Sequence, residues 1–278
     1  EKQVPYKNRL PIIEPSNPIV DSNGHSVYIK LSAQAYKNPR LDNVAGYEYR
    51  PDLSDEYFAS YVNYDNREAV LSCRGTNVNN VRDLINDLVI TFKGGANFPR
   101  LIIARAKLND LIRSNPGLKY IVTGHSLGGA VARILADENR TVKAITFNAA
   151  APPTSVAAIV GNTVTSYHIA MDIISAWLGV GGEIVHRIDQ GFELDSHLKS
   201  LYPPHALDNF FNYGNGYEIS SEKEDEKWQN WYNEKSSPTI RSIFQTLQEK
   251  PTTFKDIAID LIENAVIRKP FPHIPGVV

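Results

Sequence analysis

The segment from Tyr120 to Ala132 constrains the fold most, because it has the pattern of a strand, a sharp turn and a helix in direct succession. It opens with a short apolar run rich in β-branched residues, which predicts a buried strand. Small and aliphatic residues at helical spacing follow, which predicts a helix. Between them stands Gly124-His125-Ser126-Leu127-Gly128, so Ser126 is expected on the sharp strand-to-helix turn called a nucleophile elbow. The alternative interpretation is a glycine-rich turn with an incidental serine.

Strands and helices alternate around this segment. Apolar runs predict strands over residues 58–62, 68–72, 142–147, 163–170 and 182–188. Apolar residues at spacings of three and four predict helices over residues 26–36, 77–92 and 97–114. Such an alternation predicts an α/β fold with a mostly parallel central sheet that helices cover on both faces.

The two ends of the chain differ from this pattern. Residues 1–23 are proline-rich without a clear period and predict an extended N-terminal arm. Residues 24–215 form the predicted α/β domain, and residues 216–278 form a predicted helical C-terminal extension. This extension either packs back on the sheet or docks to a partner or membrane surface, and both interpretations remain open.

Composition excludes several classes of protein. A net charge of −2 provides no overall field that favours nucleic acid. The single cysteine, Cys73, rules out an intrachain disulfide and a cysteine-rich metal site. No uninterrupted apolar stretch is long enough to span a bilayer, and residues 1–20 lack the basic-then-apolar form of a signal peptide. Secreted and intracellular locations both stay open.

A serine at an elbow becomes a nucleophile only when a base takes its proton and an acid orients that base. In α/β-hydrolases both groups follow the serine, the acid first, each just past the end of a strand. Asp172 follows the strand predicted over residues 163–170 and is the candidate acid. Its alternative role is the N-cap of a helix over residues 173–178.

The candidate base is one of the histidines after Asp172. His186 lies inside a predicted strand, which favours a structural role, and His273 lies in the proline-rich C-terminal tail. His205 follows two prolines that stiffen the loop before it, so we expect it to be the base, with His197 as the alternative. His125 is next to the candidate nucleophile but is expected to face the wrong way to act as its base.

An oxyanion hole needs two preorganised hydrogen-bond donors. The residue after the nucleophile supplies one through its backbone N–H, which is Leu127 here. The segment Arg74-Gly75-Thr76 lies at the end of an earlier strand, and Thr76 offers both an N–H and a hydroxyl. The alternative is an ordinary turn with Arg74 on the surface.

These motifs resemble the class 3 lipases, the fungal triacylglycerol lipase and phospholipase A1-like α/β-hydrolases. The resemblance rests on Ser72–Thr76, Asp83–Leu88, Thr123–Ala130, Ile145–Pro152 and Tyr167–Ile174, and it continues to His205-Ala206-Leu207. Two departures stand out. Asn148 replaces the glycine of the usual Thr-Phe-Gly-x-Pro pattern, and the chain lacks the proline that commonly follows the apolar pair Ile173-Ile174.

The resemblance implies further roles. The segment 77–88 would be a lid over the site, with Asn77, Val78, Val81, Leu84, Ile85 and Leu88 as its residues. A fixed core helix would show the same apolar stripe. Asp87 would support the hydroxyl of Thr76 through a hydrogen bond.

The sequence therefore predicts a lipid carboxylic ester hydrolase with a triad of Ser126, Asp172 and His205. It would act through an acyl-enzyme on a lipid or long-chain ester at an interface, with transient contact to a membrane or micelle surface and with no metal or organic cofactor. Triacylglycerol lipase and phospholipase A1 are not distinguished. The alternatives are an acyltransferase or thioesterase with the same triad, and a non-catalytic lipid- or protein-binding module on a degenerate hydrolase fold.

Overall fold

The computed structural model describes residues 24–76, 98–150, 163–169, 172, 175, 184–189, 205–210 and 217–219. The predicted N-terminal arm, the lid segment, His197, His273 and nearly all of the predicted C-terminal extension lie outside these residues. The domain boundaries therefore stay predictions.

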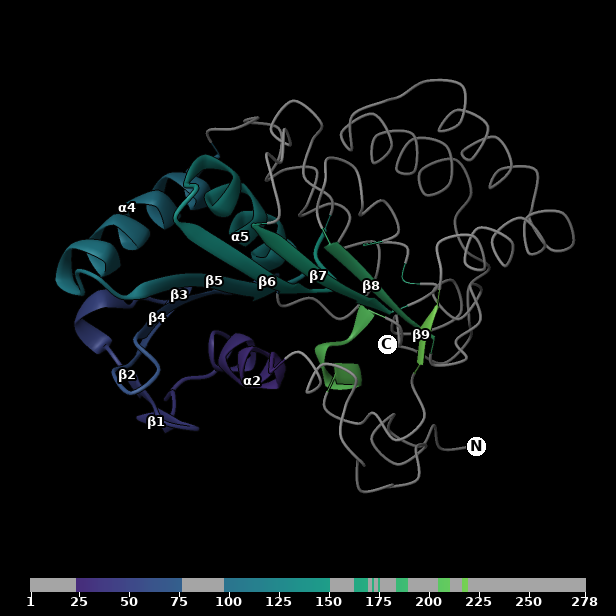
Figure 1. Cartoon of the computed structure of the whole chain (residues 1–278), viewed down its shortest axis with the longest axis horizontal. Helices are drawn as coiled ribbons and strands as arrows, with labels where there is room; N and C mark the ends of the chain where they lie inside the picture. The colour runs from purple at the N-terminus through teal and green to yellow at the C-terminus, as the bar shows by residue number, and fades with distance from the viewer. Residues whose placement is uncertain are drawn as a thin grey trace, which may run out of the picture.

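Nine strands in the described part of the chain form one sheet whose spatial order follows the sequence (Figure 1). They are β1 (Asn43–Val44), β2 (Tyr47–Tyr49), β3 (Phe58–Asn63), β4 (Glu68–Cys73), β5 (Lys119–His125), β6 (Val142–Phe147), β7 (Val164–Ile169), β8 (Ile184–Asp189) and β9 (Tyr217–Ile219). Strands β4 to β8 pair in parallel, while β1 to β4 and the pair β8–β9 are antiparallel. The predicted, mostly parallel sheet is confirmed, and its antiparallel strands β1, β2 and β9 were not foreseen.

Helices cover the sheet on two sides. Figure 1 shows α4 (Pro99–Ser114) and α5 (Leu127–Glu138) on one face and α2 (Ser26–Gln34) on the other. Two short 3₁₀ helices, η2 (Pro51–Leu53) and η5 (Leu207–Phe210), complete the described elements. The expected α/β-hydrolase architecture is present in this part of the chain.

The sheet separates two apolar cores. One gathers under α4 and α5 and includes Leu71, Leu101 and Val131, and the other lies under α2 and includes Tyr61, Phe147 and Tyr167. The strands β4 to β7 are mostly buried along their length because both of their faces are covered. This burial fixes the carboxyl ends of β4, β5 and β7, where the candidate site residues stand.

None of the helices in the described ranges is long and apolar enough to cross a membrane.

Candidate active site

Ser126 occupies the turn between β5 and α5. Its backbone angles are φ 58° and ψ −128°, a conformation that non-glycine residues seldom adopt. The carbonyl oxygen of Ser126 accepts hydrogen bonds from Ala130 N at 3.1 Å and from Ala150 N at 3.0 Å, which hold this conformation. A Cβ atom on Gly128 would lie 2.1 Å from the carbonyl oxygen of Cys73, so glycine is required for α5 to approach β4. The predicted strand–turn–helix unit is present.

The end of β4 lies against this turn. A Cβ atom on Gly75 would lie 3.2 Å from the Cβ atom of Ser126, so the two backbones are in close approach. The next residue, Thr76, has a buried hydroxyl that forms no hydrogen bond with any residue of the described ranges. Leu127 is the first residue of α5, where backbone N–H groups have no partner inside the helix. The two candidate oxyanion-hole residues, Thr76 and Leu127, are thus within one residue of this close approach, while Asp87 lies outside the described residues.

Asp172 and His205 are brought together from distant parts of the chain. The Nδ1 atom of His205 lies 3.0 Å from Oδ2 of Asp172, and the two side chains are 2% and 0% exposed. An ionised carboxylate only accepts hydrogen bonds, so Nδ1 of His205 carries the proton that is donated, and Nε2 is the nitrogen left to act as a base. The N-cap alternative for Asp172 concerns residues 173–178, of which only Ser175 is described.

His205 is held beside the elbow by packing as well as by Asp172. It lies two residues before the start of η5, whose Phe210 packs edge-on against Phe147 with the ring centroids 5.2 Å apart. Its own ring lies 4.8 Å from that of His125, the residue before Ser126. Ser126 is 1% exposed and its Oγ forms no hydrogen bond with a described residue. The candidate nucleophile thus follows directly after His125, against whose ring the candidate base His205 packs.

His125 links three parts of the site, a role that the sequence did not indicate. Its Nε2 atom lies 2.7 Å from the carbonyl oxygen of His205, and its Nδ1 lies 3.1 Å from the hydroxyl of Tyr36. The same hydroxyl accepts the N–H of Gly75 at 3.0 Å. A carbonyl only accepts and an N–H only donates, so Nε2 of His125 donates to His205 and Nδ1 accepts from Tyr36. One series of hydrogen bonds therefore joins the candidate base His205, His125 of the elbow, and Gly75 at the end of β4.

Burial keeps His125 neutral. Loss of solvation, with a smaller contribution from the nearby His205, lowers the pKa of His125 from 6.5 to about 3. This neutral state agrees with the donor and acceptor roles that its partners demand. Both ring nitrogens of His125 are engaged by other groups, His205 and Tyr36.

Asn148 joins the end of β6 to β7, the strand before the candidate acid Asp172. It has φ 42°, a backbone conformation that glycine adopts at lower cost, and its Oδ1 accepts the N–H of Ile169 at 2.8 Å. The carbonyl oxygen of Ile169 in turn accepts the N–H of Asp172 at 3.1 Å. The sequence showed Asn148 in place of the glycine of the class 3 lipase pattern, but it did not predict this contact.

Two further described histidines, His168 and His186, lie in the strands of the sheet. His168 is fully buried in β7, and His186 in β8 stacks on Tyr167 with the ring centroids 4.9 Å apart. Among the described residues, no group of three or more His, Cys, Asp or Glu side chains could hold a metal ion.

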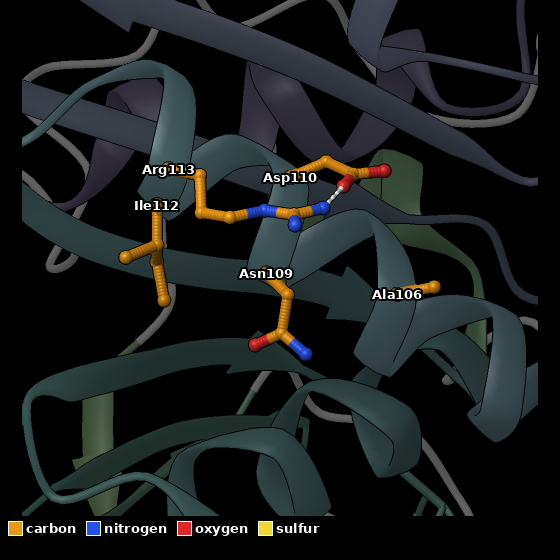
Figure 2. Close-up of a pocket in the computed structure, with 5 residues that line it drawn as sticks. All are labelled: Ala106, Asn109, Asp110, Ile112 and Arg113. Carbon is orange, nitrogen blue, oxygen red and sulfur yellow. Dashed lines mark hydrogen bonds and ion pairs between the residues drawn. The ribbon is translucent and has the colours of Figure 1, made fainter.

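A surface pocket of about 470 Å³ lies elsewhere, along one side of α4. Figure 2 shows the residues that line it, which are Ala106, Asn109, Asp110, Ile112 and Arg113. Arg113 and Asp110 form an ion pair across it. None of Ser126, Asp172 and His205 lines this pocket, so it is not the candidate active site.

Comparisons with known proteins agree with the motifs. Residues 103–173, which contain Ser126 and Asp172, match the family described as lipase (class 3). The resemblance noted in the sequence is thereby confirmed, and it supports a lipase-type ester hydrolase. A search of curated proteins finds no match.

Several solved structures are similar to this chain. The Lip2 lipase of Yarrowia lipolytica is 16% identical with a TM-score of 0.43, over 60% of this chain and 78% of that one. The triacylglycerol lipase of Penicillium expansum is 13% identical with a TM-score of 0.45, over 72% of this chain and 84% of that one. The Rhizomucor miehei lipase in its native propeptide complex is 16% identical with a TM-score of 0.42, over 72% and 83%.

Proposed function

Because this chain is related to the class 3 lipases through residues 103–173, we propose that it hydrolyses carboxylic esters of lipids. Ser126 is the nucleophile, His205 is the general base and Asp172 orients His205. The observation that carries this proposal is the 3.0 Å contact between His205 Nδ1 and Asp172 Oδ2, next to a serine on an elbow. The substrate is a triacylglycerol or the acyl ester of a phospholipid.

The reaction follows from the hydrogen-bonding roles. Nε2 of His205 takes the hydroxyl proton of Ser126 as Oγ attacks the ester carbonyl carbon. The oxygen that becomes negative accepts hydrogen bonds from the N–H of Leu127 and from Thr76. The imidazolium of His205 then protonates the departing alcohol, which leaves an acyl-enzyme. Water, deprotonated by the same nitrogen, releases the fatty acid and restores Ser126.

The burial of the site supports a covered resting state. Ser126 is 1% exposed, so an ester carbonyl needs an opening before it can reach Oγ. We assign this opening to the lid at residues 77–88, which turns its apolar side chains toward a membrane or micelle surface. A crosslink between this segment and the domain body should suppress hydrolysis of emulsified substrate. Unchanged turnover of the crosslinked protein would contradict the lid.

The main test compares p-nitrophenyl esters of increasing acyl length with wild type and Ser126→Ala. We expect hydrolysis that favours long chains, and a loss of at least about a thousand-fold in Ser126→Ala. His205→Ala should lose a similar factor, while His197→Ala serves as the control. If His197→Ala abolishes turnover and His205→Ala does not, the base assignment is wrong.

Two further outcomes separate the alternatives. Wild type that hydrolyses no ester of any chain length would favour a binding module on a hydrolase fold. Faster transfer of the acyl group to an added alcohol or thiol than to water would favour an acyltransferase. Parallel assays on triacylglycerol emulsions and phospholipid vesicles distinguish triacylglycerol lipase from phospholipase A1.

A further inference from the structure

A further buried histidine lies near the proposed acid Asp172. His168 lies in β7, and the proposed mechanism gives it no part. Its Nδ1 atom is hydrogen-bonded to the hydroxyl of Ser175, and that hydroxyl is also bonded to Oδ2 of Asp172. The side chains of His168, Ser175 and Asp172 are each 0% exposed.

The direction of each hydrogen bond follows from chemistry. The carboxylate of Asp172 only accepts, so Ser175 donates its single hydroxyl hydrogen to Oδ2. The oxygen of Ser175 must then accept from His168, which places a proton on Nδ1 of that ring. Oδ2 of Asp172 also accepts from Nδ1 of His205 at 3.0 Å. Two series of donors thus converge on one carboxylate oxygen, from His205 on one side and from Ser175 and His168 on the other.

The hydroxyl of Ser175 distinguishes this chain from the usual class 3 lipase pattern. Ser175 follows Ile173-Ile174, the position at which the class 3 lipase pattern commonly has proline. Proline carries no side-chain donor, so a chain with the usual pattern lacks this contact.

We propose that Ser175 and His168 are positioning residues that fix the carboxylate of Asp172 toward His205. The proposal rests on the proposed function, because it assigns a role to groups behind the acid of the triad. The terminal torsion of an aspartate is broad, so hydrogen bonds rather than rotamer preference decide which oxygen faces the histidine. Because the site is buried from solvent, the hydroxyl of Ser175 determines that Oδ2 is the oxygen of Asp172 that faces His205. His168 orients this hydroxyl.

Removing the hydroxyl should therefore slow the reaction without weakening substrate binding. A hydrogen bond to a charged group carries enough energy to predict a loss of about ten- to hundred-fold in kcat for Ser175→Ala. Ser175 is not placed against substrate, so KM should stay within about two-fold of wild type. Ser175→Thr keeps the hydroxyl and should recover most of kcat.

Ser72→Ala is the matched control. Ser72 is also 0% exposed, and its hydroxyl forms no hydrogen bond with a described residue, so this variant removes the same atom from a buried place with no partner. Its kcat should equal that of wild type. The proposal is overturned if Ser175→Ala keeps wild-type kcat, or if a folded Ser175→Thr, judged by its melting temperature, is as slow as Ser175→Ala.

A double-mutant cycle tests whether His168 acts through Ser175. His168→Leu alone should lower kcat, and His168→Asn should restore part of it because the amide nitrogen of asparagine can occupy the position of Nδ1. In the Ser175→Ala background, His168→Leu should cause no further loss. Losses that multiply would show two independent structural effects and would overturn the series of bonds.

A spectroscopic measurement separates this inference from the proposed function. The proton between His205 and Asp172 is expected to give a low-field ¹H NMR resonance in the resting protein. Ser175→Ala should move this resonance, and Ser72→Ala should leave it in place. If no ester is hydrolysed but the resonance moves, the positioning role stands and the hydrolase fails. If hydrolysis is found and neither the resonance nor kcat changes, the positioning role fails.

Discussion

The Nε2 atom of His125 donates to the carbonyl oxygen of His205 at 2.7 Å, so the residue before the proposed nucleophile holds the backbone of the proposed base. His125 is itself oriented by Tyr36, whose hydroxyl also accepts the N–H of Gly75. The position of the proposed base relative to the end of β4 therefore depends on the side chains of His125 and Tyr36, which take no part in the proposed chemistry.

Tyr36→Phe should lower both stability and activity. The change leaves Nδ1 of His125 and the N–H of Gly75 without their partner, which should cost about 1–3 kcal/mol in the free energy of unfolding. Urea unfolding measures this loss, and kcat should fall as well because Gly75 adjoins Thr76. Tyr120→Phe is the control, since that hydroxyl bonds only to the carbonyl oxygen of Asn115 among the described residues. Equal effects of the two substitutions on kcat would contradict the role of Tyr36.

The buried His125 should make the protein sensitive to acid. Its pKa is about 3 in the folded state and 6.5 as the ordinary value, so the unfolded chain binds the proton first as pH falls. The contribution of His125 to the free energy of unfolding is complete above pH 6.5. It is lost progressively toward pH 3, at about 1.4 kcal/mol per pH unit. His125→Gln keeps a donor for His205 but cannot titrate, so its unfolding free energy should depend less on pH in this window. An unchanged acid slope in this variant would contradict the assignment.

At high pH, Tyr47 should make the free energy of unfolding fall as pH rises, opposite to the effect of His125 in acid. Burial, with the carboxylate of Glu68 as a smaller cause, raises its pKa from 10.0 to about 12. The stabilisation is complete below pH 10 and is lost as pH rises toward 12, with a total of roughly 3 kcal/mol. Tyr47→Phe should therefore flatten the alkaline limb of the unfolding free energy. Tyr64→Phe, at a side chain that is 59% exposed, should leave that limb as it is in wild type.

Asn148→Gly should weaken the site even though it introduces the residue of the family pattern. Glycine relieves the strained φ of 42°, a gain of about 1 kcal/mol, but removes the acceptor of the buried N–H of Ile169, a loss of about 1–3 kcal/mol. We expect a net loss of stability and a lower kcat, and Asn148→Ala should be worse because it keeps the strain. Thermal unfolding and ester hydrolysis measure whether stability and kcat decrease from wild type to Asn148→Gly and then to Asn148→Ala. A glycine variant as stable and active as wild type would show that the amide does not position β7.

Local patterns predicted the central part of this fold because they reflect local physics. Apolar runs of β-branched residues form strands wherever both faces are covered, and β6 has the bounds that its apolar run predicts, 142–147. The strands β1, β2 and β9 are only two or three residues long, and their pairing with longer neighbours decides them rather than their own composition.

The sequence by itself determined the elbow at Ser126, since that turn depends on residues that are close together in the chain. It also predicted Asp172 and His205 as the acid and the base. Only the tertiary structure decided which groups meet. It brings His205 rather than a nearer histidine such as His186 to Asp172, and it adds Tyr36 and Ser175, whose side chains carry no pattern of their own. Such contacts form because buried polar groups need hydrogen-bond partners, and these partners are far apart in the sequence and become neighbours only in the folded chain.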